Sequence, residues 1–258
     1  MHPLVNIAIS AAKDAGDIIH KFSQQKERMT INEKSKNDFV TDVDVKVESS
    51  IIRAIHKAYP DHSIMAEEAG YIENKDTNTT WIIDPISGTS NFIQGYPSYV
   101  ISIAVKQNNR IEHAVIFNPI TLDIFSASRG QGARLNNQRL RVTKQNKIEK
   151  AMIGTHIPCQ DPAFLTNHIE AFKNVSGHCA GIRQTGNPAL ELAYVAAGQL
   201  DGFWGFNLKP WQMAAGSLMI KESGGLVCDV LGAEDFLKTG KIVAGNPKIL
   251  KLLLPLIK

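Results

Sequence analysis

Five short apolar runs follow one another between residues 63 and 126, and they constrain the fold more than any other feature of the sequence. Polar or turn-forming residues separate each run from the next. This length and spacing are typical of β-strands joined by turns, and they predict a largely antiparallel sheet. The runs are Ser63–Ala66, Trp81–Asp84, Tyr99–Val105, Glu112–Phe117 and Leu122–Ser126, with Gly and Asn turns at 130–138.

Helical patterns precede these runs. Residues 3–22 repeat apolar side chains at helical spacing behind Pro3, which predicts an amphipathic helix. The polar stretch 34–44 is turn-prone and predicts an acidic loop. A second helix, carrying Ile51 and Ile55, is expected to follow this loop and to end before Pro60.

Strands and helices alternate after residue 150, which predicts an α/β arrangement. No repeat or linker is visible, so we expect a single domain, 1–258, made of two packed lobes. Helices and the antiparallel sheet would form the lobe of about 1–150, and the α/β lobe would span about 151–258. The expected strands lie near 151–155, 181–183, 202–206, 226–230 and 241–244, and the expected helices near 161–173, 187–198, 211–223 and 247–256.

The composition predicts a globular protein of the cytoplasm. With 258 residues and 43% hydrophobic content, the chain can bury a large core. No stretch reaches the roughly 18 consecutive apolar residues of a membrane span, and the first residues lack the layout of a signal peptide. Cys159, Cys179 and Cys228 are widely spaced, so we expect reduced thiols. The net charge of +3 permits an anionic partner but does not by itself indicate nucleic-acid binding.

Carboxylates stand at the ends of two apolar runs. Glu67 and Glu68 follow the first run, and Asp84 ends the second, directly before a Pro/Gly turn. Such a turn projects the carboxylate from the sheet edge beside carbonyl and hydroxyl oxygens, which are ligands that Mg²⁺ prefers. The residues alone leave two interpretations open. The segment is either a metal and phosphate site, or an ordinary turn beside a solvated pair of glutamates.

Several segments together resemble the inositol monophosphatase superfamily. Its first signature is similar to Trp81-Ile-Ile-Asp84-Pro-Ile-Ser87-Gly-Thr89-Ser-Asn-Phe92, and its second to Trp211-Gln-Met-Ala-Ala-Gly216. Further matches in chain order are Asp38-Phe-Val-Thr-Asp-Val-Asp44, Glu67-Glu68, Gly130-Gln-Gly-Ala and Glu222-Ser-Gly-Gly225. The bacterial SuhB subgroup is most similar at Arg183-Gln-Thr-Gly186, Leu192-Ala-Tyr-Val-Ala-Ala-Gly198 and Val243-Ala-Gly-Asn-Pro247. This resemblance implies a layered αβαβα sandwich with the site between the lobes.

The resemblance also implies roles for individual residues. Family members hydrolyse a phosphomonoester with two or three Mg²⁺ ions around the phosphate. Glu67, Asp84 and the backbone carbonyl of Ile86 would hold the first ion, and Asp44 with Glu67 a loosely held third ion. Thr89 would orient the attacking water, so the catalytic candidates are Glu67, Thr89 and Asp44. The substrate-binding candidates are Ser87, Gly88, Thr89, Arg183 and Gly205, although Arg183 is alternatively a surface residue.

The second Mg²⁺ site departs from the family pattern. Family members hold this ion with three aspartates, and the corresponding positions here are Asp84, Ser87 and Gln212. Two neutral side chains thus replace carboxylates, which predicts one weak Mg²⁺ site and the loss of the second. Gly205 also stands where SuhB-like relatives carry a glutamate that contacts inositol hydroxyls. Alternatively, Ser87 and Gln212 coordinate through neutral oxygens while the phosphate supplies the missing charge.

Two alternative functions follow from the resemblance. The first is a phosphatase scaffold with weak or no activity that acts in transcription antitermination and ribosomal RNA synthesis, with RNA polymerase and NusA as partners. The second is an active Mg²⁺-dependent phosphatase on inositol 1-phosphate or another small phosphomonoester. Relatives also imply a homodimer, and no membrane association is expected.

Overall fold

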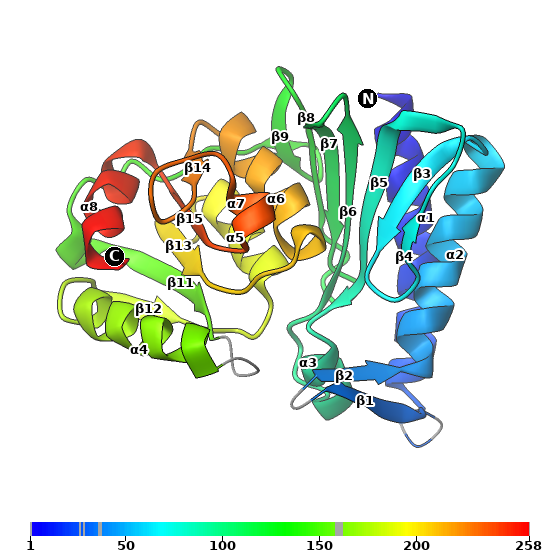
Figure 1. Ribbon diagram of the computed structural model, residues 1–258, viewed down its shortest axis with the longest axis horizontal. Coiled ribbons are helices and arrows are strands. Elements are labelled where there is room, and N and C mark those ends of the chain that lie inside the picture. The colour runs from blue at the N-terminus through cyan, green and yellow to red at the C-terminus, as the bar shows by residue number, and fades with distance from the viewer. Residues whose placement is uncertain (1, 26, 28, 36–37, 158–161, 258) are drawn as a thin grey trace.

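Helices and sheets alternate in layers in the computed structural model of the protein (Figure 1). The order is helices, a large sheet, helices, a small sheet and helices again, so the layered α/β sandwich expected from the sequence is confirmed. The helical layers are, in that order, α1 (Pro3–Ser23) with α2 (Asp42–Ala58), α5 (Pro188–Ala196) with α6 (Pro210–Glu222), and α4 (Pro162–Ser176) with α8 (Pro247–Ile257). The structure describes residues 2–25, 27, 29–35, 38–157 and 162–257.

Helix α1 forms where the apolar stripe predicted it. Pro3 occupies its first turn, where no N–H partner is needed, and the His2 ring accepts a hydrogen bond from Leu4 N. The stripe is buried against the large sheet and α2. It consists of Leu4, Val5, Ala8, Ala11, Ala12, Ala15 and Ile19.

The stretch 34–44 is not the loop that the sequence predicted. Strands β1 (Ile31–Ser35) and β2 (Asp38–Thr41) form an antiparallel hairpin, and α2 begins immediately afterwards. Thr41 sets the start of the helix, because its hydroxyl accepts a hydrogen bond from Val43 N while the Asp44 carboxylate accepts one from Thr41 N. This reciprocal capping box was overlooked in the sequence, so Asp44 was placed in a loop instead of the first turn of a helix.

The large sheet has the strand order β10-β9-β8-β7-β6-β5-β3-β4, and all described neighbours are antiparallel except the parallel pair β3 and β5. The largely antiparallel sheet is therefore confirmed. Two details differ. Thr79 and Thr80 extend β5 by pairing with β6, and the range 130–138, where turns were expected, contains β9 and the first residue of β10. The strands are β3 (His62–Ala66), β4 (Gly70–Ile72), β5 (Asp76–Ser87), β6 (Val100–Gln107), β7 (Arg110–Phe117), β8 (Ile124–Ser128), β9 (Gly132–Leu135) and β10 (Gln138–Arg139).

The small sheet has the order β12-β11-β13-β15-β14. Strand β11 is parallel to both of its neighbours, whereas β15 is antiparallel to β13 and β14. The alternation of strands and helices expected after residue 150 is confirmed, with the short helix α7 (Phe236–Thr239) in addition. The strands are β11 (Met152–His156), β12 (Gly181–Arg183), β13 (Gly202–Gly205), β14 (Leu226–Cys228) and β15 (Ile242–Gly245).

The main apolar core lies between the two sheets. Helices α5 and α6 are buried there, and Leu192, Met213 and Met219 belong to the same core cluster as residues of both sheets. Within the described ranges, no helix has the length and apolar character needed to cross a bilayer. Cys179 and Cys228 are free thiols, as expected, while Cys159 lies outside the described residues.

Candidate functional site

A small cavity of about 110 Å³ opens at the end of β5. Most of the residues that the sequence singled out meet here, and the whole lining comes from five separate segments of the chain. Asp44, Arg183 and Gly205 are not among the described residues that line it. The lining consists of Phe39, Glu67, Asp84, Ile86, Ser87, Gly88, Thr89, Ser90, Gly186 and Gln212.

An irregularity in β5 brings Asp84 and Ser87 to the same cavity. Asp84 pairs with Ser102 and Ser87 pairs with Val100, so three steps on β5 match two steps on β6. Residues three apart on a regular strand face opposite sides, whereas a one-residue bulge turns them to the same side. The bulge therefore explains why Asp84 and Ser87, which are three residues apart, both line the cavity.

Glycine is required at position 88 for two reasons. Gly88 has a φ of 95°, which residues with a side chain rarely adopt, and a Cβ there would lie 2.7 Å from Ser98 O. The preceding carbonyl is also fixed, because the buried Asn187 donates a hydrogen bond from Nδ2 to Ser87 O at 3.0 Å. The turn after β5 is thus held against α5, which begins at Pro188.

The electrostatics of the cavity favour a cation. Within the described part of the chain, both carboxylate oxygens of Asp84 and the hydroxyl of Ser87 are buried without a hydrogen-bond partner. Burial raises the pKa of Asp84 to about 7, although the nearby Ser87 and Glu67 act in the opposite direction. Burial, followed by the charge of Asp84, also raises the pKa of Glu67 well above its ordinary value. Unpartnered acceptor oxygens of this kind fit a hard cation such as Mg²⁺.

The carboxylate set of the cavity is small. Glu67 and Asp84 are the carboxylates among its described lining residues, and Ser87 and Gln212 contribute no charge. Among the residues described, no group of three or more His, Cys, Asp or Glu side chains is placed to hold a metal ion. The lining therefore fits one cation on two carboxylates better than a pair of cations.

Gln212 has a structural role that the sequence did not reveal. It is the third residue of α6, and its Oε1 accepts a hydrogen bond from Lys209 N at 2.9 Å. This bond satisfies one of the free N–H groups at the start of the helix. The other polar atom of the amide, Nε2, is a hydrogen-bond donor and cannot bind a cation.

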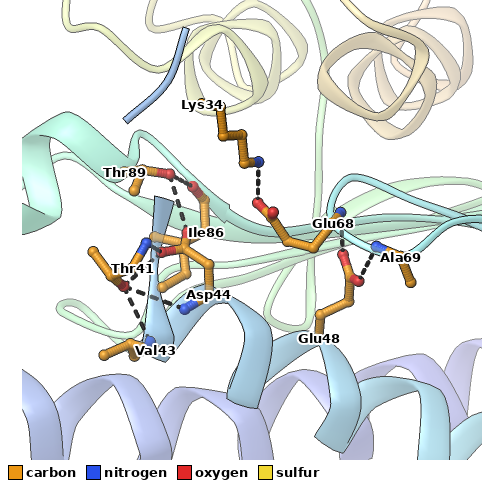
Figure 2. A network of polar contacts seen from close by, with 9 residues as sticks. All are labelled: Lys34, Thr41, Val43, Asp44, Glu48, Glu68, Ala69, Ile86 and Thr89. Atoms are coloured by element: carbon orange, nitrogen blue, oxygen red, sulfur yellow. Dashed lines mark hydrogen bonds and ion pairs between the residues drawn. The ribbon is translucent and has the colours of Figure 1, made fainter. Parts of the chain in front are cut away.

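Thr89, in the cavity lining, is linked to Asp44 by a connected network of polar contacts (Figure 2). Thr89 Oγ1 lies 3.1 Å from Asp44 Oδ1 and 3.1 Å from the carbonyl oxygen of Ile86. Asp44 Oδ2 accepts hydrogen bonds from Thr41 N at 2.8 Å and Thr41 Oγ1 at 2.6 Å. Burial raises the pKa of Asp44, and the bonds from Thr41 partly offset that effect. Asp44 thus caps α2 and orients Thr89 at the same time.

Lys34 was missed as a site residue. Its Nζ donates to Glu68 Oε1 at 2.5 Å, and Glu48 accepts hydrogen bonds from Glu68 N and Ala69 N (Figure 2). The positive charge of Lys34 lowers the pKa of Glu67, against the effects of burial and Asp84. No sequence signal marked this contact, because it depends on the pairing of β1 with β2 where the sequence predicted a loop.

Arg183 and Gly205 are placed away from the cavity lining. Arg183 is exposed, and its Nη1 donates to the neighbouring carbonyl of Ile182 at 3.0 Å. Gly205 is buried in β13, where a Cβ would lie 2.8 Å from Leu208 Cδ1 and 3.3 Å from Phe203 Cε1. The space next to Gly205 is filled by the Leu208 side chain, so a larger residue would require Leu208 to move.

The chain is similar to known proteins over its whole length. Residues 1–258 match the model of the Inositol monophosphatase family. The chain is 46% identical to the Nus factor SuhB of Pseudomonas aeruginosa, over 100% of this chain and 97% of that protein. It is 43% identical to the Nus factor SuhB of Escherichia coli, over 98% and 95% of the two chains. The crystal structure of the extragenic suppressor protein suhB from Bartonella henselae superposes with a TM-score of 0.97 at 36% identity, over 100% of this chain and 99% of that chain.

Proposed function

Because the chain belongs to the inositol monophosphatase family, we propose that it is a SuhB-like scaffold that acts in transcription antitermination and retains weak or no phosphatase activity. The charge of the cavity carries this proposal. Glu67 and Asp84 are its carboxylates among the described lining residues, and neutral Ser87 and Gln212 stand where the family places aspartates. A second divalent cation would lack the negative charge that its binding depends on.

One Mg²⁺ ion fits the residues that are present. Glu67, Asp84 and the carbonyl of Ile86 would hold it, since the Asp84 oxygens are buried acceptors without a donor. When bound, the ion would neutralise phosphate charge and lower the pKa of a water molecule. The Thr89 hydroxyl, fixed by Asp44, would orient that water. The leaving oxygen would receive no comparable support from Ser87 or Gln212, so turnover would be slow.

The transcription role is supported by the full-length similarity to proteins named Nus factor SuhB. Such a role uses the folded surface and does not require hydrolysis. RNA polymerase and NusA are the partners that we propose, and the proposal includes a homodimer that acts in the cytoplasm.

Affinity capture from a bacterial lysate tests this role. The wild-type chain and the Asp84→Asn variant are used side by side, because the substitution keeps the shape of a buried side chain and removes its charge. We expect both proteins to recover RNA polymerase and NusA equally well. Failure of the wild-type chain to recover either partner would contradict the proposal, and loss of capture only in Asp84→Asn would show that the role depends on the metal site.

A second candidate function is Mg²⁺-dependent hydrolysis of inositol 1-phosphate or another small phosphomonoester. The unpartnered oxygens of Asp84, close to Glu67, favour it. A turnover assay at millimolar Mg²⁺ separates the two candidates. We expect little activity in the wild type, and Ser87→Asp with Gln212→Asp should raise it by roughly tenfold or more. Rapid wild-type turnover that disappears in Glu67→Gln would establish the enzyme instead.

A further inference from the structure

Another cavity, of about 640 Å³, shares no described lining residue with the carboxylate site and lies at the opposite end of α6 from Gln212. It is formed where the segment after β10 passes the turn after α6 and the start of α8. We call it the basic cleft. Its lining consists of Arg141, Val142, Thr143, Lys144, Gln145, Ser223, Gly224, Asn246, Pro247 and Lys248.

Buried hydrogen bonds fix the shape of the basic cleft. The Asn246 side chain, only 3% exposed, donates from Nδ2 to Thr143 Oγ1 and to Gln145 O, each at 3.0 Å. Its Oδ1 accepts from Lys248 N and Ile249 N at the start of α8, each at 3.0 Å. This amide therefore ties the segment 141–145 to α8 with all of its hydrogen-bonding capacity in use. The walls of the cleft are held together without a ligand.

The cleft carries positive charge that its surroundings do not neutralise. Arg141, Lys144 and Lys248 are exposed cations, and no acidic residue occurs among the described residues that line the cleft. No ion pair joins these three side chains to a described carboxylate. The positive charge also continues along the chain, because residues 139–150 contain Arg139, Arg141, Lys144, Lys147 and Lys150 against the single acid Glu149.

Apart from the buried Ser223 hydroxyl, which can donate or accept, the side-chain groups that remain available in the cleft are donors. Thr143 Oγ1 already accepts a hydrogen bond from Asn246, and Gln145 Oε1 accepts from the N–H groups of Asn146 and Lys147. A suitable ligand must therefore bring acceptors and negative charge. Phosphodiester oxygens provide both, whereas base edges also need acceptors from the protein. The described lining also contains no aromatic side chain on which a base could stack.

We propose that the basic cleft binds the phosphodiester backbone of a single-stranded nucleic acid without reading its bases. The further cations of the segment 139–150 favour an extended polyanion with a charge on every unit over a short acidic protein segment. The cleft of about 640 Å³ is lined by three separate segments, and we take a single strand, whose flexible backbone can follow them, as its ligand. The small overall charge of +3 is compatible with this site, because the segment 139–150 carries five cations and one acid. The inference goes beyond the proposed function and is independent of the metal site.

Fluorescence anisotropy with a labelled 20-nucleotide uridine RNA tests the proposal over a series of salt concentrations. The test variant is Arg141→Gln with Lys144→Gln and Lys248→Gln. The matched control, Lys13→Gln with Arg53→Gln and Lys57→Gln, removes the same charges from α1 and α2, on the opposite side of the molecule from α8 (Figure 1). We expect the test variant to bind the RNA at least about tenfold more weakly than the wild type. The magnitude of its slope of log K against log salt should be about 2 smaller, while the control keeps the wild-type slope.

Further ligands separate the alternatives. A DNA strand of the same length and an RNA of mixed sequence should bind within about threefold of the uridine RNA, because only the backbone is contacted. An RNA duplex and polyglutamate should bind more weakly. No measurable RNA binding by the wild type, equal loss in both triple variants, or tighter binding of polyglutamate would overturn the proposal.

Discussion

The side-chain oxygen of Gln212 accepts a hydrogen bond from Lys209 N at 2.9 Å, at the first turn of α6 and at the edge of the carboxylate cavity. The residue that stands at a family metal position is therefore engaged in capping a helix. Its oxygen already accepts one hydrogen bond, so only its remaining lone pair could replace a carboxylate as a metal ligand. Glu67 and Asp84 are the charged residues of the described lining.

Replacing Gln212 by alanine should affect stability and not metal binding. Gln212→Ala removes the helix cap, and we expect the free energy of unfolding to fall by about 1 kcal/mol. The affinity for Mg²⁺ should stay within about twofold of the wild-type value, since the cap uses the side-chain oxygen. Urea denaturation and Mg²⁺ titration of the same preparation measure both quantities. A large loss of Mg²⁺ affinity would identify Gln212 as a ligand.

Lys34 should weaken cation binding in the cavity. Its ammonium contacts Glu68 at 2.5 Å and lowers the pKa of Glu67, so it stabilises the same negative charge that Mg²⁺ would. Removing a charge that is partly screened by solvent should tighten Mg²⁺ binding in Lys34→Met by roughly fivefold.

Lys46→Met is the matched control for this prediction, because Lys46 is paired with Asp42 on the outer surface of α2. Its Mg²⁺ affinity should equal that of the wild type. Weaker binding in Lys34→Met would mean that Lys34 organises the site and does not compete with the ion.

Glu191 should make stability depend on pH. It is 1% exposed, and burial raises its pKa from 4.5 to about 7, although Thr185 donates two hydrogen bonds to Oε1. Between pH 4.5 and about pH 7 the folded protein keeps a proton on Glu191 that the unfolded chain releases. The free energy of unfolding therefore falls as the pH rises through this range. The full loss is about 3 kcal/mol, complete above the folded pKa.

Urea denaturation at about pH 5 and about pH 8 measures this effect. Glu191→Gln cannot titrate, so its free energy of unfolding should change less between the two conditions than that of the wild type. The exposed Glu149→Gln should retain the wild-type difference. An unchanged pH dependence in Glu191→Gln would contradict the assignment.

Local patterns predicted much of the fold and the family. The stripe of α1, the strands of the large sheet and the alternation after residue 150 all depend on periodic burial, which the sequence displays directly. The family assignment from the two signature segments is confirmed by the match over the whole chain. Because most cavity residues belong to those segments, the sequence predicted their convergence.

The remaining features depend on contacts between distant segments. The bulge that turns Asp84 and Ser87 to the same side is set by pairing with β6, and Pro85 was its local signal, which was taken for a turn after the strand. Lys34 reaches Glu68 only because β1 and β2 form a hairpin, which was predicted as a loop. The basic cleft likewise requires Asn246 to bind Thr143 across more than a hundred residues, so its cations appeared unrelated in the sequence.

Isothermal titration with Mg²⁺ tests the charge deficit of the cavity most directly. We predict one weak binding event for the wild type, no event after Asp84→Asn, and a second event when Ser87→Asp and Gln212→Asp are introduced together. Two well-resolved binding events in the wild-type protein would contradict the account.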